Sequence, residues 1–374
     1  MQAKTQRYAV YVVGLAAWLL LLGAVWSQAV AASLPGEYAD GLAVRNSLLA
    51  SQIRDVAGEW YANGEWGRFP LFPGLVRLLY LGGLDLSLAM WVVHSAGVAL
   101  GLLALYAYWA DQAGPEFGWR AAAWMTAPAP LGAGVVWLMF FEEPLHIAAL
   151  CGSLFLYNRR RFGLAALALA AAVASKPFGV LMLALLVIDM ALKRARWRDV
   201  AALALLPAAV WLGWQLWVYA QTRAFLLPYT IQGATWARYA GFQILLENLG
   251  KGLRLEPFIL VYSNVVFTQT IPFATVGLAY LFALARRRVV AWYWWPFTAV
   301  SVWLTLYYTP REAARIVIPT LFPLIPLFLL GRDPASRVKH LERAVWLAMW
   351  AGQLALASAG VNYQLNGTRV GFWP

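Results

Sequence analysis

Two aspartates near the start of the chain are candidates for a general base. Asp40 and Asp55 lie in a polar interval, residues 33–77, that follows the first long apolar run. A carboxylate near a membrane surface can take the proton from an acceptor hydroxyl and so make its oxygen nucleophilic. Each aspartate also has a structural interpretation. Asp40 is at a position where it can cap the N-terminus of a following helix. Asp55 can form a solvent-exposed ion pair with Arg54 or Arg45.

Glu142 and Glu143 form an acidic pair at the mouth of another apolar run, just before Pro144. Acids at membrane depth are costly and are usually paired or functional, although acids in a first helical turn also stabilise the helix dipole. Lys176 precedes Pro177 at the junction of two apolar runs. A cation there can bind a phosphate with the help of the helix N-terminus. The structural alternative is a snorkelling lysine, whose side chain extends to place its charged end at the membrane surface.

Three arginines complete the set of candidate binding residues. Arg311 and Arg315 are spaced i,i+4 and share one helix face, which suits a lipid phosphate, whereas an internal Glu312–Arg315 pair is the structural alternative. Arg68 directly precedes an aromatic–proline run. The single cysteine, Cys151, and the widely separated histidines do not have the spacing of metal ligands.

These residues are carried by a chain whose composition is typical of a membrane protein. Of its 374 residues, 62% are hydrophobic and 12% are charged, against roughly 25% charged in soluble proteins. The chain has repeated apolar runs of a length close to that of a membrane-spanning helix, which needs about 20 residues. No segment shows the alternation of apolar and polar residues that is typical of a β-barrel strand. We therefore expect an all-α, polytopic integral membrane protein, with one transmembrane domain over residues 1–374.

The net charge of +12 is concentrated in short clusters between apolar runs. Clusters placed in this way set the orientation of a membrane protein, so they do not indicate nucleic-acid binding, and membrane lipids with anionic headgroups are additional partners. Placing them in the cytoplasm gives about eleven crossings, with the N-terminus inside and the C-terminus outside, in a plasma or ER-type membrane. The expected spans are 8–32, 86–109, 119–139, 143–157, 162–175, 177–192, 199–220, 264–285, 290–308, 313–331 and 343–362.

The segment 69–83 is too short to cross, and a crossing there would place the basic cluster 159–161 outside. We expect an external or re-entrant helix instead, within an outer loop over 33–85 that also carries an amphipathic surface helix, 41–57. A second outer loop is expected over 221–263. Because the candidate residues all fall on the outer side, function is expected there.

Several motifs, in order along most of the chain, resemble those of GT-C class membrane glycosyltransferases, especially the PIG-V-like mannosyltransferases. Residues 68–73, Arg-Phe-Pro-Leu-Phe-Pro, are similar to the family's aromatic–Phe-Pro-Leu-Tyr-Pro motif. Residues 141–146 and 175–179 are similar to its Ser-Glu-Ser-Leu-Phe and Thr-Arg-Pro-x-Gly motifs, with Glu143 on the glutamate and Lys176 on the arginine. Pro310-Arg311 is similar to the start of its Pro-Arg-Tyr segment.

The resemblance implies transfer of a hexose, with mannose expected, from a polyprenyl-phosphate donor to a lipid or glycan acceptor, with inversion at the sugar carbon. The base ranked first is Asp40, which lies at a better distance from the Phe-Pro motif than Asp55, although the family's preceding Trp is absent. No cofactor is required, and a divalent Mg²⁺ or Mn²⁺ ion is compatible. Two alternatives are a non-catalytic GT-C-like subunit acting with a partner subunit, and a lipid or small-molecule transporter.

Overall fold

The computed structural model describes residues 69–84, 86–126, 142–222, 291–297 and 299–300. All regular structure in these residues is helical, without a strand, which confirms the predicted all-α class for this part of the chain. The helices are α3 (Leu71–Leu81), α4 (Leu86–Ala113), α5 (Pro115–Thr126), α7 (Glu142–Asn158), α8 (Phe162–Ser175), α9 (Pro177–Leu192) and α10 (Trp197–Thr222).

Five of these helices coincide with predicted spans: α4, α7, α8, α9 and α10. The second half of the span predicted over 119–139, most of 290–308, and the spans 8–32, 264–285, 313–331 and 343–362 lie outside the described residues. So do the predicted surface helix 41–57 and the predicted loop 221–263, apart from its first two residues, which are the last two of α10. The number of eleven crossings therefore stays a prediction.

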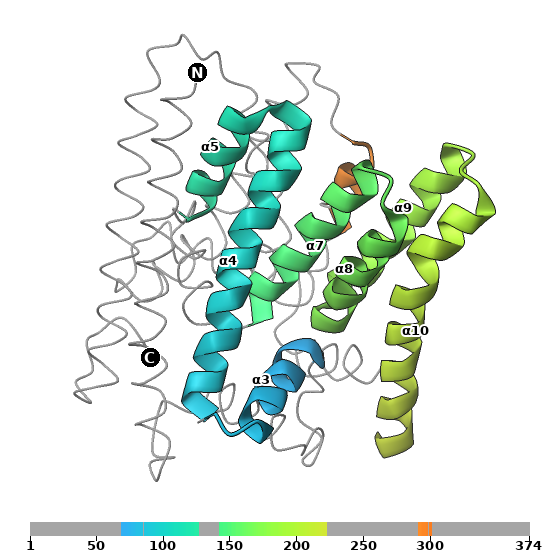
Figure 1. The fold of residues 1–374 in the computed structure, drawn as a ribbon. Helices are drawn as coiled ribbons and strands as arrows, with labels where there is room; N and C mark the ends of the chain where they lie inside the picture. Colours follow the sequence, from blue (N-terminus) through green and yellow to red (C-terminus); the bar gives the residue numbers. More distant parts are fainter. Residues whose placement is uncertain (1–68, 85, 127–141, 223–290, 298, 301–374) are drawn as a thin grey trace, which may run out of the picture.

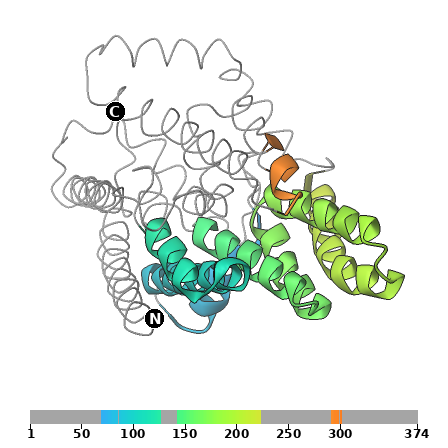
Figure 2. The same ribbon diagram turned by 90° about the horizontal axis from the view of Figure 1, so that it is seen from above.

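The helices α7, α8, α9 and α10 run alternately in opposite directions, and α8 packs between α7 and α10 (Figure 1). Seen from above, the described helices form one curved row from α4 and α5 to α10 (Figure 2). The centre of this row is close-packed because α8 is rich in alanine and buries Ala165, Ala166, Ala170 and Ala172. Small side chains let neighbouring helix backbones approach each other in a membrane.

The turn between α4 and α5 depends on two glycines. Gly114 has φ of 92°, a left-handed conformation that glycine adopts without steric cost. At Gly118 an added Cβ would lie 2.8 Å from the carbonyl oxygen of Tyr106, so no side chain fits where α5 meets α4. As a result α5 begins at Pro115, four residues before the expected start of the span over 119–139.

Two helices in the described part are long and apolar enough to cross a bilayer, over Val92–Ala113 and Trp197–Ala220. The second leaves Leu205, Leu212 and Leu216 exposed, at 69%, 51% and 57%. Exposed leucines along a helix of this length suit contact with lipid tails. These features support the prediction of a membrane protein.

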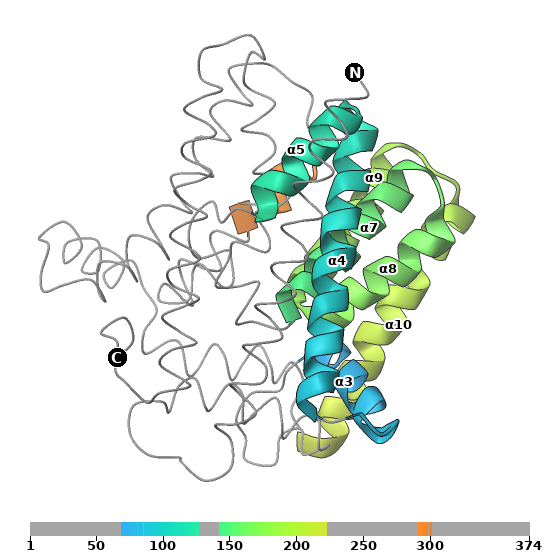
Figure 3. The same ribbon diagram turned by 60° about the vertical axis from the view of Figure 1, so that its left-hand side comes forward.

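The helix α3 has 11 residues, which gives a length of about 16 Å, roughly half of a bilayer's hydrocarbon core. It lies beneath the bundle near the start of α4, as Figures 1 and 3 show. Its Phe72 and Val76 are buried, whereas Leu78 and Leu81 are more than 60% exposed. The segment therefore forms a short amphipathic helix at one end of the bundle, in agreement with the prediction that it does not cross.

Candidate functional site

Three of the predicted site residues lie in described helices or at their junction. Glu142 and Glu143 are the first two residues of α7, and Lys176 joins α8 to α9. The structure brings them to the same end of the bundle, since α7 begins where α8 ends. The remaining candidates, Asp40, Asp55, Arg68, Arg311 and Arg315, lie outside the described residues.

A buried hydrogen bond holds these two helix ends together. The Nδ1 atom of His146 on α7 lies 2.9 Å from Oγ of Ser175, the last residue of α8. Ser175 donates its own hydrogen to the carbonyl oxygen of Ala172 at 2.8 Å. With its own hydrogen used in this way, the Ser175 Oγ atom accepts a hydrogen bond from Nδ1 of His146. His146 is fully buried, so this hydrogen bond lies inside the protein.

Lys176 is buried, with only 6% of its surface exposed. Its backbone is extended, with φ of −157° and ψ of 155°, and it separates two helices. Pro177 then opens α9 at a position where its missing N–H costs nothing. A lysine is rarely buried to this extent unless its side-chain nitrogen is compensated.

Gly179 explains the tightness of the same junction. A Cβ at this position would lie 2.4 Å from the backbone carbon of Ala172 and 2.4 Å from the nitrogen of Val173. The first turn of α9 thus packs directly on the backbone of α8, and only glycine fits. The Ser-Lys-Pro-x-Gly pattern of residues 175–179 therefore has a structural cause, and it fixes the position of Lys176.

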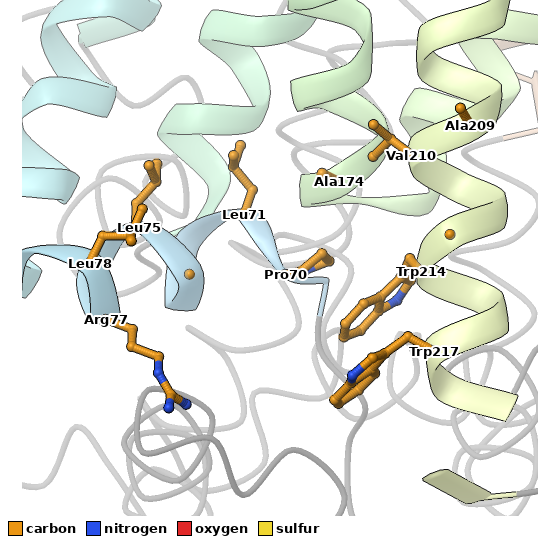
Figure 4. Close-up of a pocket in the computed structure, with 12 residues that line it drawn as sticks. Pro70, Leu71, Leu75, Arg77, Leu78, Ala174, Ala209, Val210, Trp214 and Trp217 are labelled. Carbon is orange, nitrogen blue, oxygen red and sulfur yellow. The ribbon is translucent and has the colours of Figure 1, made fainter. Parts of the chain in front are cut away.

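Beside this junction lies an open groove of about 780 Å³ between α3, the end of α8 and the middle of α10 (Figure 4). Its walls are almost entirely apolar, and its lining residues are Pro70, Leu71, Gly74, Leu75, Arg77, Leu78, Ala174, Ala209, Val210, Gly213, Trp214 and Trp217. Ala174, near the end of α8, is the lining residue nearest in the chain to Lys176, two positions before it. An apolar groove of this size that is open on one side suits a hydrocarbon chain.

Aromatic and charged side chains stand at the two walls of this groove. The rings of Trp214 and Trp217 on α10 stack, with centroids 5.0 Å apart and an angle of 10° between their planes. Figure 4 shows both rings extending toward Pro70, and shows Arg77 extending from α3 away from Ala174. Arg77 is half-buried and is the one charged side chain among the described residues that line the groove. Sequence reasoning missed all three, although a lone arginine in the apolar segment 71–81 is a usable signal.

The opposite end of the bundle holds a buried carboxylate that sequence reasoning also missed. Asp189 on α9 is 1% exposed and accepts hydrogen bonds from the Tyr157 hydroxyl, from Nζ of Lys193 at 2.6 Å and from Nε1 of Trp292 at 2.7 Å. The signal was one acid inside the apolar run 177–192. The three donors come from α7, from the end of α9 and from residues 291–297. By accepting all three hydrogen bonds, this carboxylate links these segments.

The described residues contain no group of three or more His, Cys, Asp or Glu side chains that suits a metal ion. Since both candidate aspartates lie elsewhere in the chain, the expectation about Mg²⁺ or Mn²⁺ stays a prediction. Comparison with known proteins finds no matching family model, curated protein or solved structure.

Proposed function

We propose that this protein is an integral membrane glycosyltransferase of the GT-C kind. It moves a hexose, with mannose the first sugar to test, from a polyprenyl-phosphate donor to a lipid or glycan acceptor. The observation that carries the proposal is the apolar groove, whose lining includes Ala174, two residues before the buried Lys176. A polyprenyl-phosphate sugar has the same two parts, a long hydrocarbon chain and an anionic head.

The groove supports binding of the donor's chain. Burying hydrocarbon against its walls is favourable by about 0.8 kcal/mol for each CH₂ group. Small residues at Gly74, Ala174 and Gly213 leave room for a branched chain. The lining also includes Pro70 and Leu71 of the motif at 68–73, and Ala174, the residue before the motif at 175–179, and both motifs resemble those of the GT-C family.

The proposed reaction is a single displacement. Asp40, or Asp55 in its place, takes the proton of the acceptor hydroxyl, and the acceptor oxygen attacks the sugar C1 atom. The bond from C1 to the phosphate oxygen breaks, and polyprenyl phosphate leaves with the bonding electron pair and one further negative charge. Lys176 and Arg311, with Arg68 or Arg315, stabilise that charge. Glu143, with Glu142 beside it, orients the acceptor.

Filling the groove tests this proposal without removing a polar group. An added Cβ at Gly213 meets no atom within 4 Å, so Gly213→Leu fits the folded protein and occupies the groove instead. Gly163, at the start of α8, has equally open space but does not line the groove, so Gly163→Leu is the matched control. Both changes put a better helix former in place of glycine.

We expect Gly213→Leu to raise the KM for a polyprenyl-phosphate-mannose donor by about tenfold or more, because two displaced CH₂ groups already correspond to that factor. Gly163→Leu should transfer sugar like the wild type. The measurement is transfer of labelled mannose by purified full-length protein in nanodiscs, over a panel of lipid and glycan acceptors. Equal donor KM values for the two leucine variants would overturn the role of the groove.

A further inference from the structure

The turn that ends α7 and the turn that ends α9 have the same backbone geometry. In the first, the N–H groups of Arg160 and Arg161 donate to the carbonyls of Tyr157 and Leu156, both at 2.9 Å. In the second, the N–H groups of Arg194 and Ala195 donate to Ala191 and Met190, at 3.0 and 2.9 Å. This pair of bonds defines the Schellman motif, in which the first residue beyond the helix cap is left-handed.

An arginine occupies the left-handed position in both turns. Arg160 has φ of 56° and Arg194 has φ of 52°. The helix α3 ends in the same motif with Gly83 at that position, at φ of 95°. Glycine is the usual residue there because any Cβ is strained in the left-handed region. At the other end of the bundle glycine follows α4, with Gly114 at φ of 92°, whereas arginine takes the left-handed position, at a steric cost, after α7 and after α9.

The residue before each of these arginines already supplies a cation to its helix end. Arg159 binds Asp111 at 2.7 Å, and Lys193 binds Asp189 at 2.6 Å. Each helix end therefore already has a positive charge near its dipole, and it needs no strained arginine for that purpose. Arg160 and Arg194 are exposed, and neither pairs with a carboxylate of the described residues. Cytoplasmic orientation does not explain them either, since a basic residue anywhere in the loop serves that purpose.

The two turns lie side by side at the level where the candidate membrane spans end. The Tyr157 hydroxyl near the end of α7 donates to Asp189 near the end of α9, so the two helix ends are in contact. One span ends at Ala113, just after Asp111, and the other begins at Trp197. Trp197 is 74% exposed and stacks under Arg198, a combination typical of the headgroup region.

We propose that Arg160 and Arg194 together bind the phosphodiester headgroup of an anionic phospholipid. The two guanidinium groups, carried on turns whose helix ends are in contact, would each donate hydrogen bonds to the phosphate oxygens. Arg161, Arg196 and Arg198 are exposed nearby and add to the positive field. This site lies at the opposite end of the bundle from the groove, and it does not depend on the proposed sugar transfer.

The test titrates detergent-solubilised full-length protein with phosphatidylglycerol, phosphatidylcholine or inorganic phosphate, and reads bound lipid by native mass spectrometry and Tm by thermal unfolding. Wild type should bind phosphatidylglycerol more tightly than phosphatidylcholine. Arg160→Gly with Arg194→Gly should weaken phosphatidylglycerol binding about fivefold for each arginine removed, whereas the Tm without lipid should not fall. Arg160→Lys with Arg194→Lys keeps the charge but loses the guanidinium donors, so its affinity for phosphatidylglycerol should fall between those of the wild type and the glycine pair.

Three results would overturn the proposal. The first is that the glycine pair binds phosphatidylglycerol as tightly as the wild type does. The second is that the wild type binds both lipids with equal affinity. The third is that inorganic phosphate raises the Tm of the wild type as much as phosphatidylglycerol does. If the glycine pair unfolds, Arg160→Asn with Arg194→Asn serves instead, because asparagine also tolerates the left-handed region. The same loss of lipid binding is then expected.

Discussion

Ser175 and His146 lie 2.9 Å apart, from Oγ to Nδ1, and join the end of α8 to the first turns of α7. Through this bond the segment that begins with Glu142 and Glu143 is fixed beside the residue that precedes Lys176. The structure thus unites two of the sequence motifs, separated by about thirty residues in the chain, at the groove end of the bundle.

Ser175→Ala should lower the free energy of unfolding by about 1 kcal/mol, because it removes a buried hydrogen bond between two helices. Ser153→Ala is the control. Ser153 is equally buried but bonds only to the carbonyl of Leu150 on its own helix, at 2.7 Å, so its loss should cost well under ~1 kcal/mol. The measurement is unfolding of both variants in one detergent. Equal destabilisation would contradict a role of Ser175 between the helices.

Asp189→Ala should destabilise the protein by about 3 kcal/mol or more, since it leaves the Tyr157 hydroxyl and the Trp292 indole without their shared acceptor. Asp111→Ala removes the acid of an exposed ion pair with Arg159 and should cost less than about 1 kcal/mol. Thermal unfolding of the two variants compares the two sites directly. If the Asp189→Ala protein is as stable as the Asp111→Ala protein, the hydrogen bonds of Asp189 do not stabilise the packing of α7, α9 and residues 291–297.

Gly179→Ala should destabilise the protein by at least about 2 kcal/mol, because the added methyl group meets the α8 backbone and one of the helices must move. Gly163→Ala, with open space at its Cβ, should remain within about 1 kcal/mol of the wild type. Urea or thermal unfolding in detergent gives both values. If Gly179→Ala proves as harmless as its control, the close approach of α9 to α8 is wrong.

Lys176→Met should reduce sugar transfer, since it removes a positive charge from the proposed phosphate site while nearly keeping the length of the side chain. Lys176→Arg keeps the positive charge at this position and should retain transfer. Transfer rates at saturating and at low donor separate an effect on kcat from one on KM, and unfolding curves confirm that each variant is folded. Full activity in folded Lys176→Met would remove this lysine from the mechanism.

The positions of the helices were largely predictable because charged and proline residues interrupt the apolar runs. The cluster 159–161 separates α7 from α8, the dipeptide Lys176-Pro177 separates α8 from α9, and 193–196 separates α9 from α10. Charged residues are unfavourable inside the hydrocarbon region, and proline is unfavourable inside a helix, so each of these interruptions marks the end of a helix or a break in it. The start of α5 was missed because it depends on the conformation of Gly114, which apolar periodicity does not report.

The groove and the buried carboxylate could not be predicted, because both depend on contacts between distant segments. Asp189 bonds to a residue 103 positions away in the chain. The groove joins α3 to the middle of α10, where Pro207 lies inside the helix and Figure 1 shows α10 change direction along its length. A single sequence shows which face of a helix is apolar, but it does not show which two faces meet.

The most direct test of the central claim is mannose transfer by the purified protein in nanodiscs, with wild type beside Asp40→Asn and Asp55→Asn. We predict transfer by the wild type and its loss, by about a hundredfold or more, in the variant that lacks the base, first of all Asp40→Asn. The other asparagine variant should stay active, and both should unfold like the wild type. Transfer that both variants retain in full would contradict an aspartate base, and no transfer with any polyprenyl donor would contradict the proposed enzyme.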